Sequence, residues 1–190
     1  MERDNATVAI GVTGHRILME LEKVEAGIEE ALVHIERKYP NRSLTVLSAL
    51  AEGADRLVAR SVLARLGAQL IATLPLSRSE YLEDFARAES REEFLGFLDR
   101  AAQVIELPPA PTRDAAYEAG GEYILNRCDV LLAVWDGQGA QGQGGTGGTV
   151  ARARERGLPV AWVHAGNRRP GTLEPTTLGE EQGSVTFERL

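Results

Sequence analysis

The sequence predicts an α/β fold in which a mostly parallel central sheet lies between two layers of helices. Short apolar runs of strand length alternate along the chain with longer segments whose apolar residues recur at three- and four-residue spacing. The first pattern is typical of buried strands and the second of amphipathic helices. A helix between two strands returns the chain to the same edge, which favours parallel pairing. The apolar runs are continuous, as expected for a sheet covered on both faces.

Each expected element has its own sequence signal. The expected strands cover residues 7–12, 44–50, 69–74, 104–107, 129–135 and 159–163. The first helix begins near residue 21 and ends before Pro40, because the residue before a proline avoids the helical region. The second covers residues 57–66 and ends at Gly67. Further helices are expected at 79–87, 90–102, 114–127 and 147–156.

Aromatic residues gather in the middle of the chain. Tyr81, Phe85, Phe94 and Phe97 fall within the two short helices expected there. Aromatic residues at helical spacing usually belong to a core, and we interpret these in that way. Cys128 precedes an apolar run and is interpreted as a small buried residue.

The organisation is one domain followed by a tail. Residues 1–165 are expected to form the domain, because the chain of 190 residues is within the usual size of one core. Residues 166–190 are rich in Gly, Pro, Thr and Glu, and we expect an irregular C-terminal tail that contributes little to the core. Residues 185–187 could form a minor strand within it.

Charge and composition exclude several classes of function. The net charge is −7, with no basic tract, which argues against non-specific nucleic-acid binding. The apolar stretches are far shorter than the roughly 20 residues of a membrane helix. One cysteine and three scattered histidines offer no zinc spacing, so no metal is expected. A single cysteine and the absence of a secretory signal favour the cytoplasm.

Unusual polar and glycine residues follow several of the expected strands. In an open parallel sheet, ligands bind beyond the carboxyl ends of the strands. We therefore expect one ligand site at this edge. Its predicted residues are Gly14, His15 and Arg16 after the first strand, Ser48, Glu52, Gly53, Asp55 and Arg56 after the second, and Asp136, Gly144, Gly145, Thr146, Gly147, Gly148 and Thr149 after the 129–135 strand.

The glycine run at 144–149 is the strongest signal. Successive backbone amides in such a run can cradle an anion, and the helix that begins there adds its positive end. Thr146 and Thr149 can donate hydroxyls to phosphate oxygens. The alternative is a flexible linker, since glycine-rich linkers are common. The 11–14 stretch is Gly-x-x-Gly, which is neither a dinucleotide fingerprint nor a P-loop.

The charged residues have a binding interpretation and a structural one. Arg16 offers a bidentate fork for an anion, and the alternative is a solvated charge. Glu52 and Asp55 are the candidate catalytic or ribose-binding carboxylates. The alternative is that they only charge the first turn of a helix, where the dipole favours acids. Asp136 could contact a ligand from the end of its strand.

Three motifs in order resemble the SLOG superfamily, which includes the LOG-type, "lysine decarboxylase-like" phosphoribohydrolases and nucleotide-sensing modules. They are the stretches at 11–16, 48–56 and 133–137 with 144–149. The resemblance covers about residues 7–164 and implies a Rossmann-like three-layer fold. It also implies a nucleotide or nucleotide-sugar ligand of the ADP-ribose or NAD-derived type, with no cofactor required. A homodimer and an effector-protein partner are further expectations from it.

One departure from the family pattern bears on activity. LOG hydrolases have Pro-Gly-Gly-x-Gly-Thr-x-x-Glu, whose final Glu serves catalysis. Here Gln143 precedes the run and no Glu occurs until Glu155. The missing Glu favours a ligand-binding or sensing module. The alternative is a nucleoside 5'-monophosphate phosphoribohydrolase, which acts as an N-glycosidase. Whether the chain is an enzyme therefore stays open.

Overall fold

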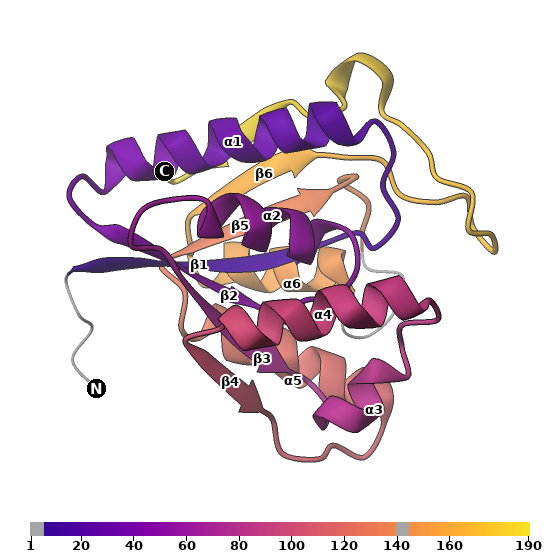
Figure 1. Ribbon diagram of the computed structural model, residues 1–190. Coiled ribbons are helices and arrows are strands. Elements are labelled where there is room, and N and C mark those ends of the chain that lie inside the picture. Colours follow the sequence, from indigo (N-terminus) through magenta and orange to yellow (C-terminus); the bar gives the residue numbers. More distant parts are fainter. Residues whose placement is uncertain (1–5, 140–144) are drawn as a thin grey trace.

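The computed structural model describes residues 6–139 and 145–190 and shows the predicted α/β fold (Figure 1). Seven strands form one sheet in the order β4-β3-β2-β1-β5-β6-β7. The strands are β1 (Thr7–Gly14), β2 (Ser43–Ser48), β3 (Gln69–Leu74), β4 (Gln103–Glu106), β5 (Val130–Trp135), β6 (Val160–His164) and β7 (Val185–Glu188). All neighbouring pairs are parallel except β6 and β7, which are antiparallel.

Helices cover both faces of the sheet. They are α1 (Leu21–Lys38), α2 (Ala54–Leu63), α3 (Arg78–Leu82), α4 (Ala88–Arg100), α5 (Arg113–Leu125) and α6 (Thr146–Glu155). In Figure 1, α1, α2 and α4 lie on the near face, whereas α5 and α6 lie behind the sheet. The result is a Rossmann-like three-layer arrangement, as the sequence predicts.

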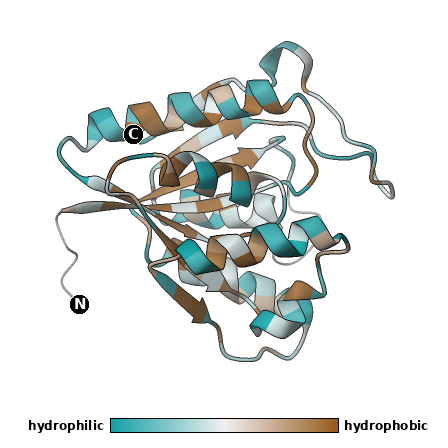
Figure 2. Cartoon of the chain, in the orientation of Figure 1, coloured by the Kyte–Doolittle hydropathy of each residue, from teal (hydrophilic) through white to brown (hydrophobic). Residues whose placement is uncertain are grey.

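The core forms where the strands meet these helices. Figure 2 shows apolar colouring along the strands and hydrophilic colouring on outward helix surfaces. On α1, the residues Val24, Ile28, Leu32 and Ile35 recur at three- and four-residue spacing, and all four are fully buried. This face packs against β6 and β7. The predicted burial of Tyr81, Phe85, Phe94, Phe97 and Cys128 is confirmed, with at most 5% of each exposed.

Strand order creates a switch point between β1 and β5. From β1 the chain builds outward through β2, β3 and β4, then crosses to the other side of β1 to add β5 and β6. The crossover helices α1 and α2 lie on one face, and α5 and α6 on the other. The loops that follow β1 and β5 therefore diverge to opposite faces, which leaves a crevice at the carboxyl end of the sheet.

The C-terminal segment is more ordered than the sequence indicates. The minor strand that the sequence allows at 185–187 is present as β7, and it pairs with β6 from Val160 to Val163. Val185, Phe187 and Leu190 pack against the main core. The expectation of an irregular tail that contributes little to the core is therefore corrected, because the edge strand β7 and its apolar side chains pack onto the sheet and α1. No helix among the described residues is long and apolar enough to cross a membrane.

Candidate functional site

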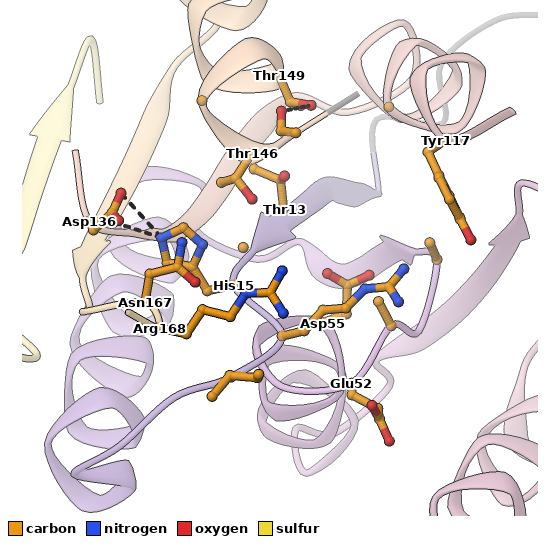
Figure 3. Close-up of a pocket in the computed structure, with 18 of the residues that line it drawn as sticks. Thr13, His15, Glu52, Asp55, Tyr117, Asp136, Thr146, Thr149, Asn167 and Arg168 are labelled. Carbon is orange, nitrogen blue, oxygen red and sulfur yellow. Dashed lines mark hydrogen bonds and ion pairs between the residues drawn. The ribbon is translucent and has the colours of Figure 1, made fainter. Parts of the chain in front are cut away.

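A cleft of about 1170 Å³ opens at the switch point, at the carboxyl ends of β1 and β5 (Figure 3). It brings together most of the predicted site residues. Those that line it are Gly14, His15, Arg16, Glu52, Asp55, Asp136, Gly145, Thr146, Gly147 and Thr149. Arg16 and Thr146 lie at the same end of the sheet, as one shared site requires. Gly144 lies outside the described residues.

Four predicted residues, Ser48, Gly53, Arg56 and Gly148, do not line the cleft. Arg56 is buried and directed away, where its Nε donates to the Leu50 carbonyl at 3.0 Å and one terminal nitrogen donates to Glu93 at 2.9 Å. Its guanidinium stacks 4.5 Å from the Phe85 ring centroid. Arg56 therefore holds α4 against the 48–56 loop.

Ser48 positions the carboxylate of Asp55. The buried Ser48 hydroxyl donates to Asp55 Oδ2 at 2.9 Å and accepts the Leu50 amide at 2.9 Å. Leu50 has a φ of 59°, an unusual left-handed conformation for leucine, and this bond helps to hold it. Ser48 is thus one layer behind the cleft, fixing the loop that carries Asp55.

Asp55 is the most perturbed acid of the cleft. Its side chain reaches the cleft wall although only 6% of the residue is exposed. Burial raises the pKa of Asp55 to about 6, against the opposing effects of the Ser48 hydroxyl, the Ala51 and Ala49 amides and the charge of Arg16. A carboxyl that titrates near neutral pH can exchange a proton with a bound ligand.

Glycine at positions 14 and 53 allows two loops to meet. A Cβ on Gly14 would lie 2.4 Å from the Ala54 Cβ and 2.7 Å from the Val134 carbonyl. Gly53 has a φ of 77°, and a Cβ there would lie 2.4 Å from the Arg16 carbonyl. The Ala54 amide then donates to the His15 carbonyl at 3.0 Å. The loops after β1 and β2 are consequently fixed to each other.

His15 connects the β1 loop to the end of β5. The Asp136 amide donates to His15 Nε2 at 3.1 Å, and Asp136 Oδ1 lies 3.2 Å from the same nitrogen (Figure 3). Burial lowers the pKa of His15, although Asp136 acts in the opposite direction. Nε2 accepts the Asp136 amide, so the imidazole ties the loop after β1 to the end of β5 at the wall of the cleft.

The start of α6 forms one end of the cleft. Gly145 is the N-cap residue and has no side chain, so no side-chain cap bond forms. Amides in the first turn of a helix have no partner within the helix. Thr146, Thr149 and Thr13 of β1 line this end beside them. The arrangement offers backbone and hydroxyl donors together with the positive end of a helix.

An acidic and aromatic wall faces the start of α6, and sequence reasoning missed it. Asp84 Oδ1 accepts from Arg113 at 2.6 Å, and Asp84 Oδ2 accepts from the Tyr117 hydroxyl. Arg16 lies 3.7 Å from Asp84 and stacks 5.6 Å from the Tyr117 ring centroid. Asp84 lies in the turn after α3 and Arg113 at the start of α5, so neither follows a strand end and neither carries a strand-end signal.

Residues beyond β6 line the remaining side, and these too were missed. Asn167, Arg168, Arg169 and Thr176 all border the cleft. The signal that could have found them is a polar stretch just after the end of a core strand, because Asn-Arg-Arg closely follows the 159–163 strand. His164, at the end of that strand, instead stacks on Trp162 and hydrogen-bonds to Thr186.

The charges of the cleft are balanced. Four arginines line it, Arg16, Arg113, Arg168 and Arg169, and so do four acids, Glu52, Asp55, Asp84 and Asp136. Within residues 6–139 and 145–190, no cluster of three or more His, Cys, Asp or Glu side chains could hold a metal ion.

No protein-family model matches the chain, and no curated protein matches it.

Proposed function

We propose that the cleft binds a phosphate-bearing nucleotide or nucleotide-sugar and that the protein senses this ligand without consuming it. One observation carries the proposal: the open first turn of α6 and the hydroxyls of Thr13 and Thr146 lie in the same cleft as Arg16. Helix amides, hydroxyls and a guanidinium together form a donor set that favours phosphate oxygens. The resemblance to SLOG proteins supports the same class of ligand.

The size of the cleft supports a ligand larger than phosphate alone. The phosphate donors lie at one end, and the half-buried Tyr117 contributes an aromatic ring to the wall. Nucleobases stack favourably on such surfaces. Glu52 and Asp55 also line the cleft, and their carboxylates can accept hydrogen bonds from ribose hydroxyls.

Hydrolysis is the second candidate, and the raised pKa of Asp55 is the observation that favours it. A ribosyl transfer needs a carboxylate within reach of the sugar, and Asp55 could serve. The start of α6 argues against hydrolysis, because the helix has no acid in its first turn. Arg152, one turn further, pairs with Glu118 at 2.6 Å and Glu122 at 2.9 Å on α5.

Calorimetry with AMP, ADP and ADP-ribose tests binding, and chromatography for free base after long incubation tests turnover. We expect binding without free base, and a loss of affinity of about tenfold or more in Arg16→Ala. Arg37 lies exposed near the end of α1, outside the cleft, so Arg37→Ala is the matched control. Failure of the wild type to bind any of the three ligands would overturn the proposal. Release of base that is abolished in Asp55→Asn would establish the hydrolase instead.

A further inference from the structure

Residues 166–184, which we call the strap, connect β6 to β7 across the carboxyl edge of the sheet. In Figure 1 the strap extends beyond the strand ends and returns past the first turn of α1. It belongs to the segment whose composition indicated an irregular tail. Its hydrogen bonds show two fixed parts, a base beside α1 and a narrow double arm beside the cleft.

One buried side chain, Gln182, closes the base of the strap. Its Oε1 accepts the Gly166 amide at 2.9 Å and the Leu178 amide at 3.1 Å. Its Nε2 donates to the Met19 carbonyl at 2.9 Å. Only 4% of Gln182 is exposed. The side chain therefore ties both ends of the loop to each other and to the segment before α1.

The two arms of the strap pair next to the cleft. The Thr176 amide donates to the Asn167 carbonyl at 2.7 Å, and Arg168 forms an antiparallel bridge with Pro175. The Arg169 amide donates to the Glu174 carbonyl at 2.9 Å, and their side chains form an ion pair at 3.4 Å. These bonds set the direction in which the Arg168 side chain leaves the backbone.

Arg168 differs from the other arginines of the cleft. In Figure 3 its side chain extends from the strap toward the middle of the cleft. Arg113 is paired with Asp84, Arg169 with Glu174, and Arg16 lies 3.7 Å from Asp84. In the part of the chain that the structure describes, Arg168 alone among the four has no ion pair, and its side chain makes no hydrogen bond. A guanidinium held over a donor-rich cleft without a partner is available to an anionic ligand.

We propose that the strap is a ligand-binding element and that Arg168 is the cationic anchor it supplies to the phosphate of the bound ligand. The inference rests on the proposed function, because it concerns the same cleft. Arg168 presents a planar fork that can donate to two phosphate oxygens at once, in the same cleft as the first turn of α6. Gln182 does not line the cleft and acts as a positioning residue for the strap.

Calorimetry with ADP and with ADP-ribose tests the anchor. Arg168→Ala should weaken binding about 10- to 100-fold, as expected for a charge-assisted bond. Arg168→Lys should recover part of this loss, because lysine keeps the charge and loses the fork. Arg37→Ala removes the same charge far from the cleft and should change nothing. Arg168 is exposed, so melting temperatures should stay equal.

The positioning role of Gln182 is tested by a double-mutant cycle. Gln182→Ala should weaken binding, but it should have little further effect when Arg168 is already alanine. Additive losses in the cycle would show that Gln182 does not act through Arg168 and would overturn its positioning role. Equal affinity of wild type and Arg168→Ala would overturn the anchor while leaving the proposed function intact. A wild type that binds neither probe would overturn both.

Discussion

Asp55→Asn should remove a pH dependence of stability that the buried carboxyl creates. The folded pKa is about 6, and the ordinary value is 3.8. Between these values the folded protein keeps the proton and the unfolded chain loses it, so stability falls as pH rises. The difference of about two pH units corresponds to about 3 kcal/mol. Below pH 4 this cost is absent, and above pH 6 it is fully present.

Urea unfolding at intervals from pH 4 to pH 7 measures this cost. The free energy of unfolding of the wild type should decrease relative to Asp55→Asn across that range, most steeply between pH 4 and pH 6. Asn also alters the bond from Ser48, an effect that is common to all pH values, so the slopes are compared instead of the absolute stabilities. Asp99→Asn, an exposed change on α4, should follow the wild type. Parallel curves for wild type and Asp55→Asn would refute the reasoning.

Three further outcomes are expected. The diester phosphates of ADP-ribose do not titrate near neutral pH, so a pH dependence of its affinity reports on the protein. The affinity of the wild type should fall as pH rises through about 6, because an ionised Asp55 offsets the charge of Arg16, whereas the affinity of Asp55→Asn should stay constant. Equal changes in affinity for the two proteins between pH 5 and pH 7.5, measured by calorimetry, would contradict this. Gly14→Ala should destabilise the fold by about 1–3 kcal/mol, because the added Cβ clashes with Ala54. Gly96→Ala is the matched control: the added Cβ meets open space and should stabilise α4 by up to about 1 kcal/mol. Equal urea midpoints for the two variants would contradict the packing argument. Removing residues 185–190 should cost roughly 3 kcal/mol or more, because β7 and its apolar contacts are lost; an unchanged melting temperature would show that β7 is dispensable.

The fold and half of the site could be predicted from sequence because both depend on strand ends. Parallel strands bring their carboxyl ends to one edge, so residues such as Gly14, Asp55 and Asp136 were placed together without knowledge of strand order. The sequence does not show which residues in the first turn of a helix are directed into the cleft. Arg56 follows Asp55 by one residue, and a helix rotates about 100° per residue, so Arg56 is directed toward α4.

Two parts of the cleft could not be predicted for different physical reasons. The contact of Asp84 with Tyr117 depends on how α3 and α5 pack, which local sequence patterns do not encode. The composition of the strap resembles that of a linker, whereas the buried Gln182 amide and the backbone bonds between the two arms give it a fixed structure. Composition averages over many residues, whereas a buried side chain whose hydrogen bonds are all satisfied can order a segment from a single position.

The cleft is assembled from stretches that span most of the chain, from Val12 after the start of β1 to Thr176 in the strap. Local opening of any one stretch would dismantle the binding surface, so the ligand acts on the equilibrium between the complete fold and every partly opened form. A ligand at 100 times its dissociation constant adds about 2.7 kcal/mol to the free energy of unfolding. For a chain of this size that corresponds to an increase of roughly 5–10 °C in melting temperature. The melting temperature therefore reports whether the cleft is occupied, whatever the chemistry of the ligand and whichever part of the cleft it contacts.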